Sequence, residues 1–188
     1  MPTKGEQSKE RILETANRLF YERGFNSTSF QDIAEVSGVP KGNFYFYFKS
    51  KGALLETVIE GRLERFREAL TGWERDLSTP KERLLRCIDM LVNDRAEIER
   101  YGCPMGSLSL EIGKQQPEMK KQAAKIFRLL VDWNENQLRE LDVGDQAPAL
   151  AHRLIARLQG ASVLAFVLED KIRAREEIDD IKAWIEAL

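Results

Sequence analysis

Cysteine and histidine are scarce in this chain of 188 residues, which contains two cysteines and one histidine. Cys87, Cys103 and His152 are too few for an all-Cys/His structural zinc site or a disulfide framework. The sequence also lacks a paired-ligand metal motif such as H-E-x-x-H, a phosphate-binding glycine loop, and a set of nucleophile, base and orienting residue. We therefore predict a protein that is not an enzyme and that holds no metal or cofactor.

Long apolar runs are absent as well. No run approaches the roughly 20 residues that cross a bilayer, and the N-terminal segment MPTKGEQSKE lacks the apolar core of a signal peptide. Hydrophobic residues make up 43% and charged residues 32% of the chain, which is typical of an ordinary soluble protein. We expect a cytoplasmic protein with no membrane partner.

Strand-like alternation of apolar and polar residues is also absent, and proline and glycine leave helix-length segments between them. Apolar residues at helical spacing predict a first helix from near Ser8 to before Gly24. Its buried stripe comprises Ile12, Leu13, Ala16, Leu19 and Phe20. Ser50 is a suitable N-cap for a longer helix. Further helices are expected over residues 80–99, 104–113, 117–141, 146–170 and 175–188, so the sequence predicts an all-α fold of about nine helices.

Two short helices joined by a tight turn follow the first helix. Thr28 and Gln31 form the pattern of a capping box, which marks a helix N-terminus. Gly38 can take the left-handed conformation of a helix C-terminus, and Pro40 suits the first turn of the next helix. Short helix, glycine-containing turn and short helix together predict a helix-turn-helix.

The second of these helices carries five consecutive aromatic residues, FYFYF at 44–48. Successive side chains point in different directions, so one small core cannot bury all five rings. In a helix-turn-helix, the leading end of the second helix reaches base edges. Residues 1–51 also hold 8 Lys and Arg against 6 Asp and Glu, a mild bias toward an anionic partner.

The side chains around this aromatic run suit DNA. Lys41 can donate to guanine and Asn43 can pair with adenine, while Gly42 allows close backbone approach. The hydroxyl groups of Tyr45 and Tyr47 are suited to phosphate oxygens. Lys51 lies near a helix N-terminus, which itself attracts anions.

The segment from Gly24 to Leu55, GFNSTSFQDIAEVSGVPKGNFYFYFKSKGALL, resembles the DNA-binding domain of the TetR family of bacterial transcriptional regulators. The resemblance implies a helix-turn-helix DNA-binding domain over residues 1–52 and a larger helical effector-binding and dimerisation domain over residues 53–188. It assigns groove contacts to Lys41, Gly42, Asn43 and Phe46, and phosphate contacts to Thr28, Tyr45, Tyr47 and Lys51. It places Phe44 and Phe48 in buried positions. Phe46 can touch a thymine methyl group or be partly buried.

The same resemblance implies a homodimeric repressor that binds a palindromic double-stranded DNA operator and is released by a small-molecule effector. The dimer interface is expected on the last two long helices, with contacts from Leu150, Leu154, Leu158, Ala161, Ala165, Ile178, Ile181 and Ile185. The alternative is that these stripes pack only within one subunit.

An effector pocket is expected in the second domain for a small apolar or aromatic ligand. The candidate lining residues are Phe66, Leu70, Trp73, Met90, Cys103, Phe127, Leu130, Trp133 and Asn134. Aromatic and methionine residues at helical spacing also occur in ordinary cores, so a core role is the alternative for each.

The segment YGCPMGSLSLEIG, residues 101–113, places Cys103 at the N-cap between two expected helices. Unpaired N–H groups and the helix dipole favour a reactive thiolate there. The segment is similar to a glycine-cysteine motif of some TetR-type regulators, including the NemR-like sensors of electrophiles. Two alternatives are therefore open: a thiol switch at Cys103, or a small buried residue at a helix junction.

Overall fold

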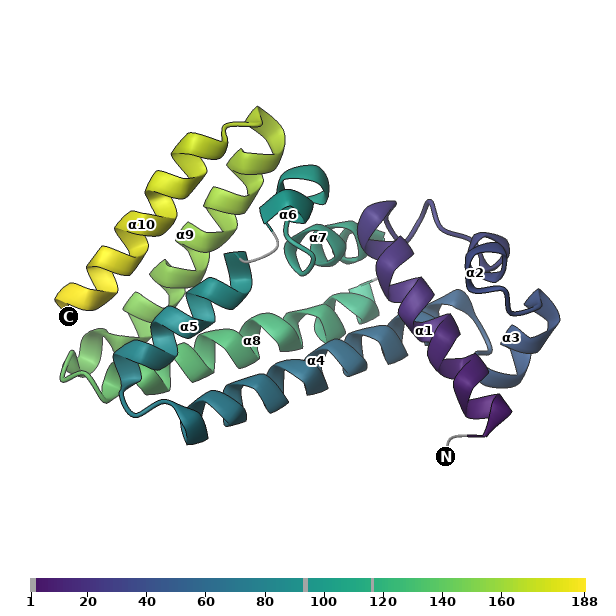
Figure 1. Cartoon of the computed structure of the whole chain (residues 1–188), viewed down its shortest axis with the longest axis horizontal. Coiled ribbons are helices and arrows are strands. Elements are labelled where there is room, and N and C mark those ends of the chain that lie inside the picture. Colours follow the sequence, from purple (N-terminus) through teal and green to yellow (C-terminus); the bar gives the residue numbers. More distant parts are fainter. Residues whose placement is uncertain (1–2, 93–94, 116) are drawn as a thin grey trace. The chain divides into compact units, whose positions relative to one another are not determined.

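The computed structural model describes residues 3–92, 95–115 and 117–188, and these ranges contain helices and their connections without a strand (Figure 1). The predicted all-α fold is confirmed. The α-helices are α1 (Lys4–Glu22), α2 (Phe30–Ser37), α3 (Lys41–Tyr47), α4 (Lys51–Asp76), α5 (Pro80–Val92), α6 (Arg95–Tyr101), α7 (Gly106–Gln115), α8 (Pro117–Arg139), α9 (Ala147–Leu168) and α10 (Lys171–Ala187). A 3-10 turn, η1, covers Gly144–Gln146.

Helix boundaries follow local capping chemistry. Ser50 Oγ accepts a hydrogen bond of 3.1 Å from the N–H of Ala53, as its position before α4 predicts. Thr3 and Glu6 form a capping box at the start of α1, which therefore begins earlier than the sequence indicates. The single helix expected over 80–99 is divided into α5 and α6, and residues 93–94 between them lie outside the described residues.

The chain forms two compact units, one of Met1–Glu64 with Ser107–Ala124 and one of Arg65–Gly106 with Lys125–Leu188. The first unit extends beyond the expected boundary at residues 52 and 53 because part of α4 packs with α1. Arg62 is buried and donates from Nε to Asn17 Oδ1 at 2.6 Å. The expected boundary therefore stays a sequence-based prediction, while the contacts place all of α7 except Gly106 with the N-terminal helices.

The core of the first unit is built around α1. Apolar side chains at helical spacing on one face of α1 are buried, as the periodicity predicts. They are joined in the core by residues of α2, α3 and α4. The buried set includes Ile12, Ala16, Leu19, Phe20, Ile33, Phe44, Phe48, Leu54 and Leu55.

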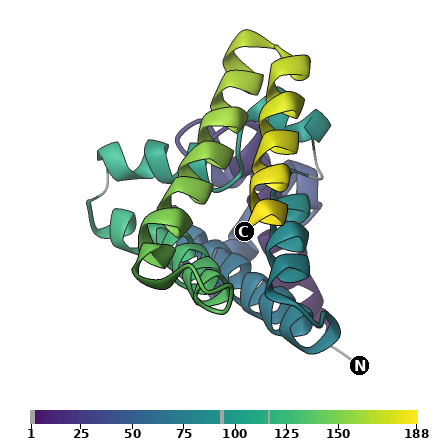
Figure 2. The ribbon, with the colours of Figure 1, turned by 90° about the vertical axis from the view of Figure 1, so that its left-hand side faces the viewer.

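In the second unit, α9 and α10 run side by side in both views (Figures 1 and 2). All eight residues expected at a dimer interface are buried within the single chain: Leu150, Leu154, Leu158, Ala161, Ala165, Ile178, Ile181 and Ile185. This burial agrees with the alternative that the stripes pack within one subunit, and it leaves little of these side chains exposed to a second copy. Their role in a dimer interface stays a prediction.

The opposite side of α9 carries the exposed apolar side chains. We call these residues the α9 apolar face: Val163, Leu164, Phe166, Val167 and Leu168. Periodicity alone cannot tell which of two apolar stripes on a helix is covered by the same chain. In the described ranges, no helix combines the length and apolar character needed to cross a membrane.

Candidate nucleic-acid interface

The helix-turn-helix consists of α2, the turn at Gly38 and α3. Gly38 has φ of 66°, the left-handed conformation that its place after α2 predicts. The guanidinium of Arg11 on α1 donates to the carbonyl of Ser37 and lies against Gly38. Val39 is buried beside them. The turn is therefore fixed by both its own backbone and a side chain from α1.

The start of α2 differs by one residue from the sequence-based interpretation. The capping box is made by Ser29 and Asp32, not by Thr28 and Gln31. Ser29 donates from its hydroxyl at 2.5 Å and from its backbone N–H at 2.7 Å to Asp32 Oδ2, and these bonds hold the pKa of the carboxyl below its ordinary value. Both residue pairs fit the capping pattern, and burial of Thr28 decides between them.

The five aromatic rings of α3 and its C-terminal end divide into two groups. Phe44 and Phe48 are buried, as expected, and Phe44 lies 5.3 Å from the ring of Phe30 between centroids. Tyr45 is 61% exposed and Phe46 is 86% exposed, while Tyr47 is half-buried. The open question about Phe46 is thereby answered in favour of exposure.

The exposed side of α3 presents the leading residues predicted to meet DNA. Lys41, Gly42 and Asn43 are exposed, together with Tyr45 and Phe46. A Cβ added at Gly42 would meet no atom within 4 Å, so the backbone there is open to a partner. A lysine, an amide and two aromatic rings on one short helix offer hydrogen bonds and flat apolar contacts to base edges. Lys49, which sequence reasoning did not single out, is exposed just beyond them.

Two of the predicted phosphate contacts have roles inside the domain. Thr28 is buried, and its hydroxyl donates to the carbonyl of Gly24 at 2.7 Å. Lys51 Nζ donates to the carbonyls of Phe25 at 2.7 Å and Thr28 at 2.8 Å, and it lies 4.3 Å from the ring centroid of Phe25. These placements give no support to contacts between either side chain and phosphate.

Burial lowers the pKa of the Lys51 ammonium, and the carboxylates of Glu111 and Asp32 oppose part of this shift. The ammonium is therefore held among carbonyl groups by a balance of desolvation and nearby negative charge. It stabilises the loop between α1 and α2, which positions the helix-turn-helix.

Glu111 on α7 holds the same loop from another side. Its Oε2 accepts from the N–H of Phe25 at 2.9 Å and its Oε1 accepts from the N–H of Asn26 at 2.8 Å. Gly24 has φ of 86°, and a Cβ there would lie 2.9 Å from Glu111 Oε2. Sequence reasoning missed this clamp because its partners are 86 and 85 residues apart, and nothing local marks Glu111.

The residues expected to line an effector pocket lie in the second unit, where several of them contact one another. The rings of Trp73 and Trp133 meet edge to face at 5.9 Å between centroids, and Trp133 Nε1 donates to Glu74 Oε1 at 2.7 Å. Asn134 is fully buried, with Nδ2 donating to the carbonyl of Leu130 at 2.7 Å. Its Oδ1 has no hydrogen-bond partner in the described part of the chain.

The remaining expected effector residues are divided between buried and partly exposed positions. Leu70, Leu130 and Cys103 are buried, whereas Phe66, Met90 and Phe127 are partly exposed. A cavity in this unit is lined by none of the nine expected residues. It lies among α5, α6, α9 and α10.

Cys103 does not take the N-cap position that the sequence predicts, because residues 104–105 form a turn and α7 begins only at Gly106. Cys103 still lies close to this helix start. Its Sγ accepts from the N–H of Gly106 at 3.5 Å and from Gln159 Nε2 at 3.3 Å. The residue is only 8% exposed. Cys87 is also buried, and burial raises the pKa of its thiol to about 12.

Comparison with known families agrees with this architecture in both parts of the chain. Residues 12–58 match the model of the bacterial regulatory proteins of the tetR family. Residues 80–173 match the C-terminal domain of LmrA/YxaF-like transcriptional regulators. The first match covers the helix-turn-helix, and the second covers most of the remaining helices.

Relatives match nearly the whole chain. An HTH-type transcriptional regulator in the lacX 3′ region of Lactococcus lactis subsp. lactis is 31% identical over 185 residues, which cover 95% of this chain and 93% of that protein. The HTH-type transcriptional repressor DhaR of Mycobacterium sp. strain GP1 is 29% identical over 177 residues, covering 91% of this chain and 86% of that protein.

Solved structures share the fold at lower identity. A TetR transcriptional regulator from Legionella pneumophila has a TM-score of 0.83 at 22% identity and covers 100% of this chain and 97% of its own. The reduced form of E. coli NemR has a TM-score of 0.82 at 23% identity, covering 97% and 96%. The chain belongs to the TetR family of bacterial transcriptional regulators and is a helix-turn-helix DNA-binding regulator rather than an enzyme.

Proposed function

We propose that this regulator is a cytoplasmic homodimeric repressor that binds a palindromic operator through α3 and leaves it when a small-molecule effector binds the C-terminal domain. The observation that carries the DNA-binding part is the exposed side of α3. A ring as exposed as Phe46 gains nothing from the domain's own core. Beside Lys41, Asn43 and Tyr45, it forms a surface suited to a major groove.

An operator-binding assay tests the roles of these side chains. Replacing Asn43 by alanine should cost about 1–3 kcal/mol of binding and relax the choice of base at one position, if the amide reads adenine. Replacing Lys41 by alanine should also cost about 1–3 kcal/mol of binding and relax the preference for guanine at the base that it contacts.

The assay should use DNA upstream of the protein's own gene and include Tyr45→Ala and Phe46→Ala. Leu110→Ala is a matched control, since Leu110 is an exposed apolar residue of the same unit outside the helix-turn-helix. Equal affinity for wild type, Tyr45→Ala and Phe46→Ala would count against this surface.

A second copy of the chain is the proposed occupant of the α9 apolar face. Exposed apolar side chains gathered on one helix commonly mark an interaction surface. A palindromic operator needs two helix-turn-helix units related by two-fold symmetry. Leu164→Glu should therefore yield a monomer with weakened operator binding, because a carboxylate would be buried without a partner in the dimer.

Analytical ultracentrifugation and the operator assay test this surface together. Leu110→Glu introduces the same charge at an exposed apolar site outside the α9 apolar face and should leave the mass unchanged. A dimer that survives Leu164→Glu and Val167→Glu would refute the proposed interface.

Regulators of this family bind DNA and typically a ligand in the C-terminal domain. The proposed effector is small and apolar or aromatic. An effector that binds more tightly to the conformation with low operator affinity shifts the population toward it, so its differential affinity sets the extent of release.

A covalent switch at Cys103 is a second candidate, favoured by the two N–H donors that point at its sulfur. Burial of Cys103 restricts access to it. Treating wild type and Cys103→Ser with N-ethylmaleimide before the operator assay separates the candidates. Release of both proteins to the same extent would exclude Cys103 as the switch.

A further inference from the structure

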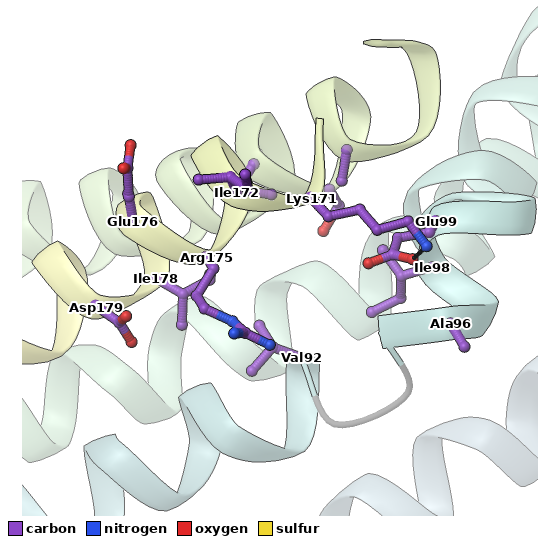
Figure 3. A pocket seen from close by; sticks show the side chains of 14 residues that line it. Val92, Ala96, Ile98, Glu99, Lys171, Ile172, Arg175, Glu176, Ile178 and Asp179 are labelled. Atoms are coloured by element: carbon purple, nitrogen blue, oxygen red, sulfur yellow. Dashed lines mark ion pairs between the residues drawn. The ribbon is translucent and has the colours of Figure 1, made fainter. Parts of the chain in front are cut away.

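A cavity of about 490 Å³ opens within the second unit, among the end of α5, α6, α9 and α10 (Figure 3). Its volume falls in the range of roughly 300–1,000 Å³ that is usual for small-molecule sites. The cavity is open to solvent along α10, where Lys171, Ile172 and Arg175 are exposed. A small molecule can therefore enter it without a change in the fold.

The walls of the cavity are mainly apolar. Val92 and Ile98 come from α5 and α6, and Ile178 comes from α10. The α9 wall is made of small residues, Ala161 and Ala165, which leave the space open. These surfaces favour a ligand with an apolar body, because burying apolar area is the main source of affinity in such a site.

Several charged side chains at the cavity form ion pairs, and others do not. Lys171 Nζ lies 2.5 Å from Glu99 Oε2, and Figure 3 shows this ion pair at the end of the cavity formed by α6. Glu176 pairs with Arg173 at 2.9 Å. Three of these four groups line the cavity, and each has its charge offset by a partner.

Arg175 differs from them. Its guanidinium forms no ion pair or hydrogen bond with any residue that the structure describes. In Figure 3 its guanidinium extends from α10 toward Val92, across the lined space. Asp179, one turn further along α10, lines the cavity but is not paired with Arg175 in the described ranges. The guanidinium of Arg175 therefore carries a positive charge and a planar set of N–H donors that a ligand can use.

We propose that this cavity binds an amphipathic anion, with its apolar body against the walls and a carboxylate on the guanidinium of Arg175. Arg175 is exposed and therefore accessible to a ligand, and a guanidinium matches a carboxylate with two parallel hydrogen bonds. The proposed occupant is a small molecule because the cavity volume suits one. The α9 apolar face, where we propose the second copy, does not line the cavity, whereas the exposed Ile172 of α10 does and adds apolar surface for the ligand. The assignment of this ligand as the effector rests on the proposed function.

Ligands of equal chain length that differ only in their head group test the proposal on the full chain. Decanoate, decan-1-ol and decylamine are titrated by calorimetry near neutral pH, with decanoate below its micelle concentration. Decanoate should bind saturably and most tightly. Arg175→Gln should weaken decanoate about tenfold or more and leave decan-1-ol unchanged, because only the charged pair is lost.

Two further variants locate the site. Asp179→Asn should leave decanoate binding unchanged or tighter, since it removes a nearby negative charge. Ala165→Leu should fill the cavity and weaken decanoate and decan-1-ol alike, with the helical circular dichroism spectrum showing that the fold persists. The proposal is overturned if decanoate does not saturate, if it binds no more tightly than decan-1-ol, if decylamine binds best, or if Arg175→Gln weakens decanoate and decan-1-ol equally.

The operator assay keeps this proposal distinct from the proposed function. A protein without ligand that forms no salt-sensitive operator complex refutes repressor function, whatever the calorimetry gives. Decanoate binding that depends on Arg175 but does not change operator affinity refutes the effector role alone. Release of the operator by decanoate in wild type, but not in Arg175→Gln, supports both.

Discussion

Replacing Glu111 by alanine should loosen the loop that leads into the helix-turn-helix. Each carboxylate oxygen accepts one backbone N–H, from Phe25 and from Asn26. The Phe25 bond is partly buried, so its N–H would lose its acceptor without full access to water, whereas the Asn26 bond is exposed. Counting one orphaned donor and one lost charge-assisted bond, we expect Glu111→Ala to lower the free energy of unfolding by about 2–4 kcal/mol.

Glu111→Gln should have a smaller effect. A glutamine offers one acceptor oxygen and one NH₂ group, so it can satisfy Phe25 while the Asn26 N–H turns to water. The expected loss is about 0.5–1.5 kcal/mol. Glu60→Gln makes the same chemical change at an exposed residue of α4 and should be neutral.

Urea denaturation gives the unfolding free energies, and amide hydrogen exchange at Phe25 and Asn26 reports on the clamp itself. Faster exchange at these amides in Glu111→Ala, without change along α1, is the expected local signature. If Glu111→Ala matches Glu60→Gln in stability and both amides keep their protection, the clamp does not stabilise the loop and the reasoning fails.

The remaining predictions concern single positions. Gly24→Ala should cost roughly 1–2 kcal/mol in urea denaturation because the left-handed conformation disfavours a Cβ, whereas Gly42→Ala, with open space around it, should not destabilise the protein. Asn134→Leu should raise the unfolding free energy by about 1 kcal/mol because it removes a buried acceptor without a partner, and a clear loss of stability would contradict this. In a Cys103→Ser background, Cys87 should resist N-ethylmaleimide at pH 8 until urea is added, since burial raises the pKa of its thiol to about 12. Because this folded pKa lies above the unfolded value of 9.0, the contribution of Cys87 to stability should be complete below pH 9 and should decline as the pH rises toward 12.

Features set by neighbouring residues were predictable from the sequence. The left-handed turn at Gly38, the cap at Ser50 and the helical stripe of α1 each depend on contacts within a few positions along the chain. The division of the aromatic run follows the same rule, because helical geometry alone prevents Phe44 and Tyr45 from facing the same way. Such rules do not distinguish two candidate N-cap residues that are neighbours in the sequence, as Thr28 and Ser29 are before α2.

The sequence by itself determined an all-α regulator with a helix-turn-helix and an outward aromatic face, because caps, turns and periodicity act over one or two helical turns. Only the tertiary structure decided that the stripe through Leu154 is core, and that Glu111 and Lys51 hold the loop after α1. It also decided that Arg175 extends across an apolar cavity. Those outcomes depend on which helices pack together although they lie far apart in the sequence. Local hydrogen bonding and helical spacing do not specify that packing.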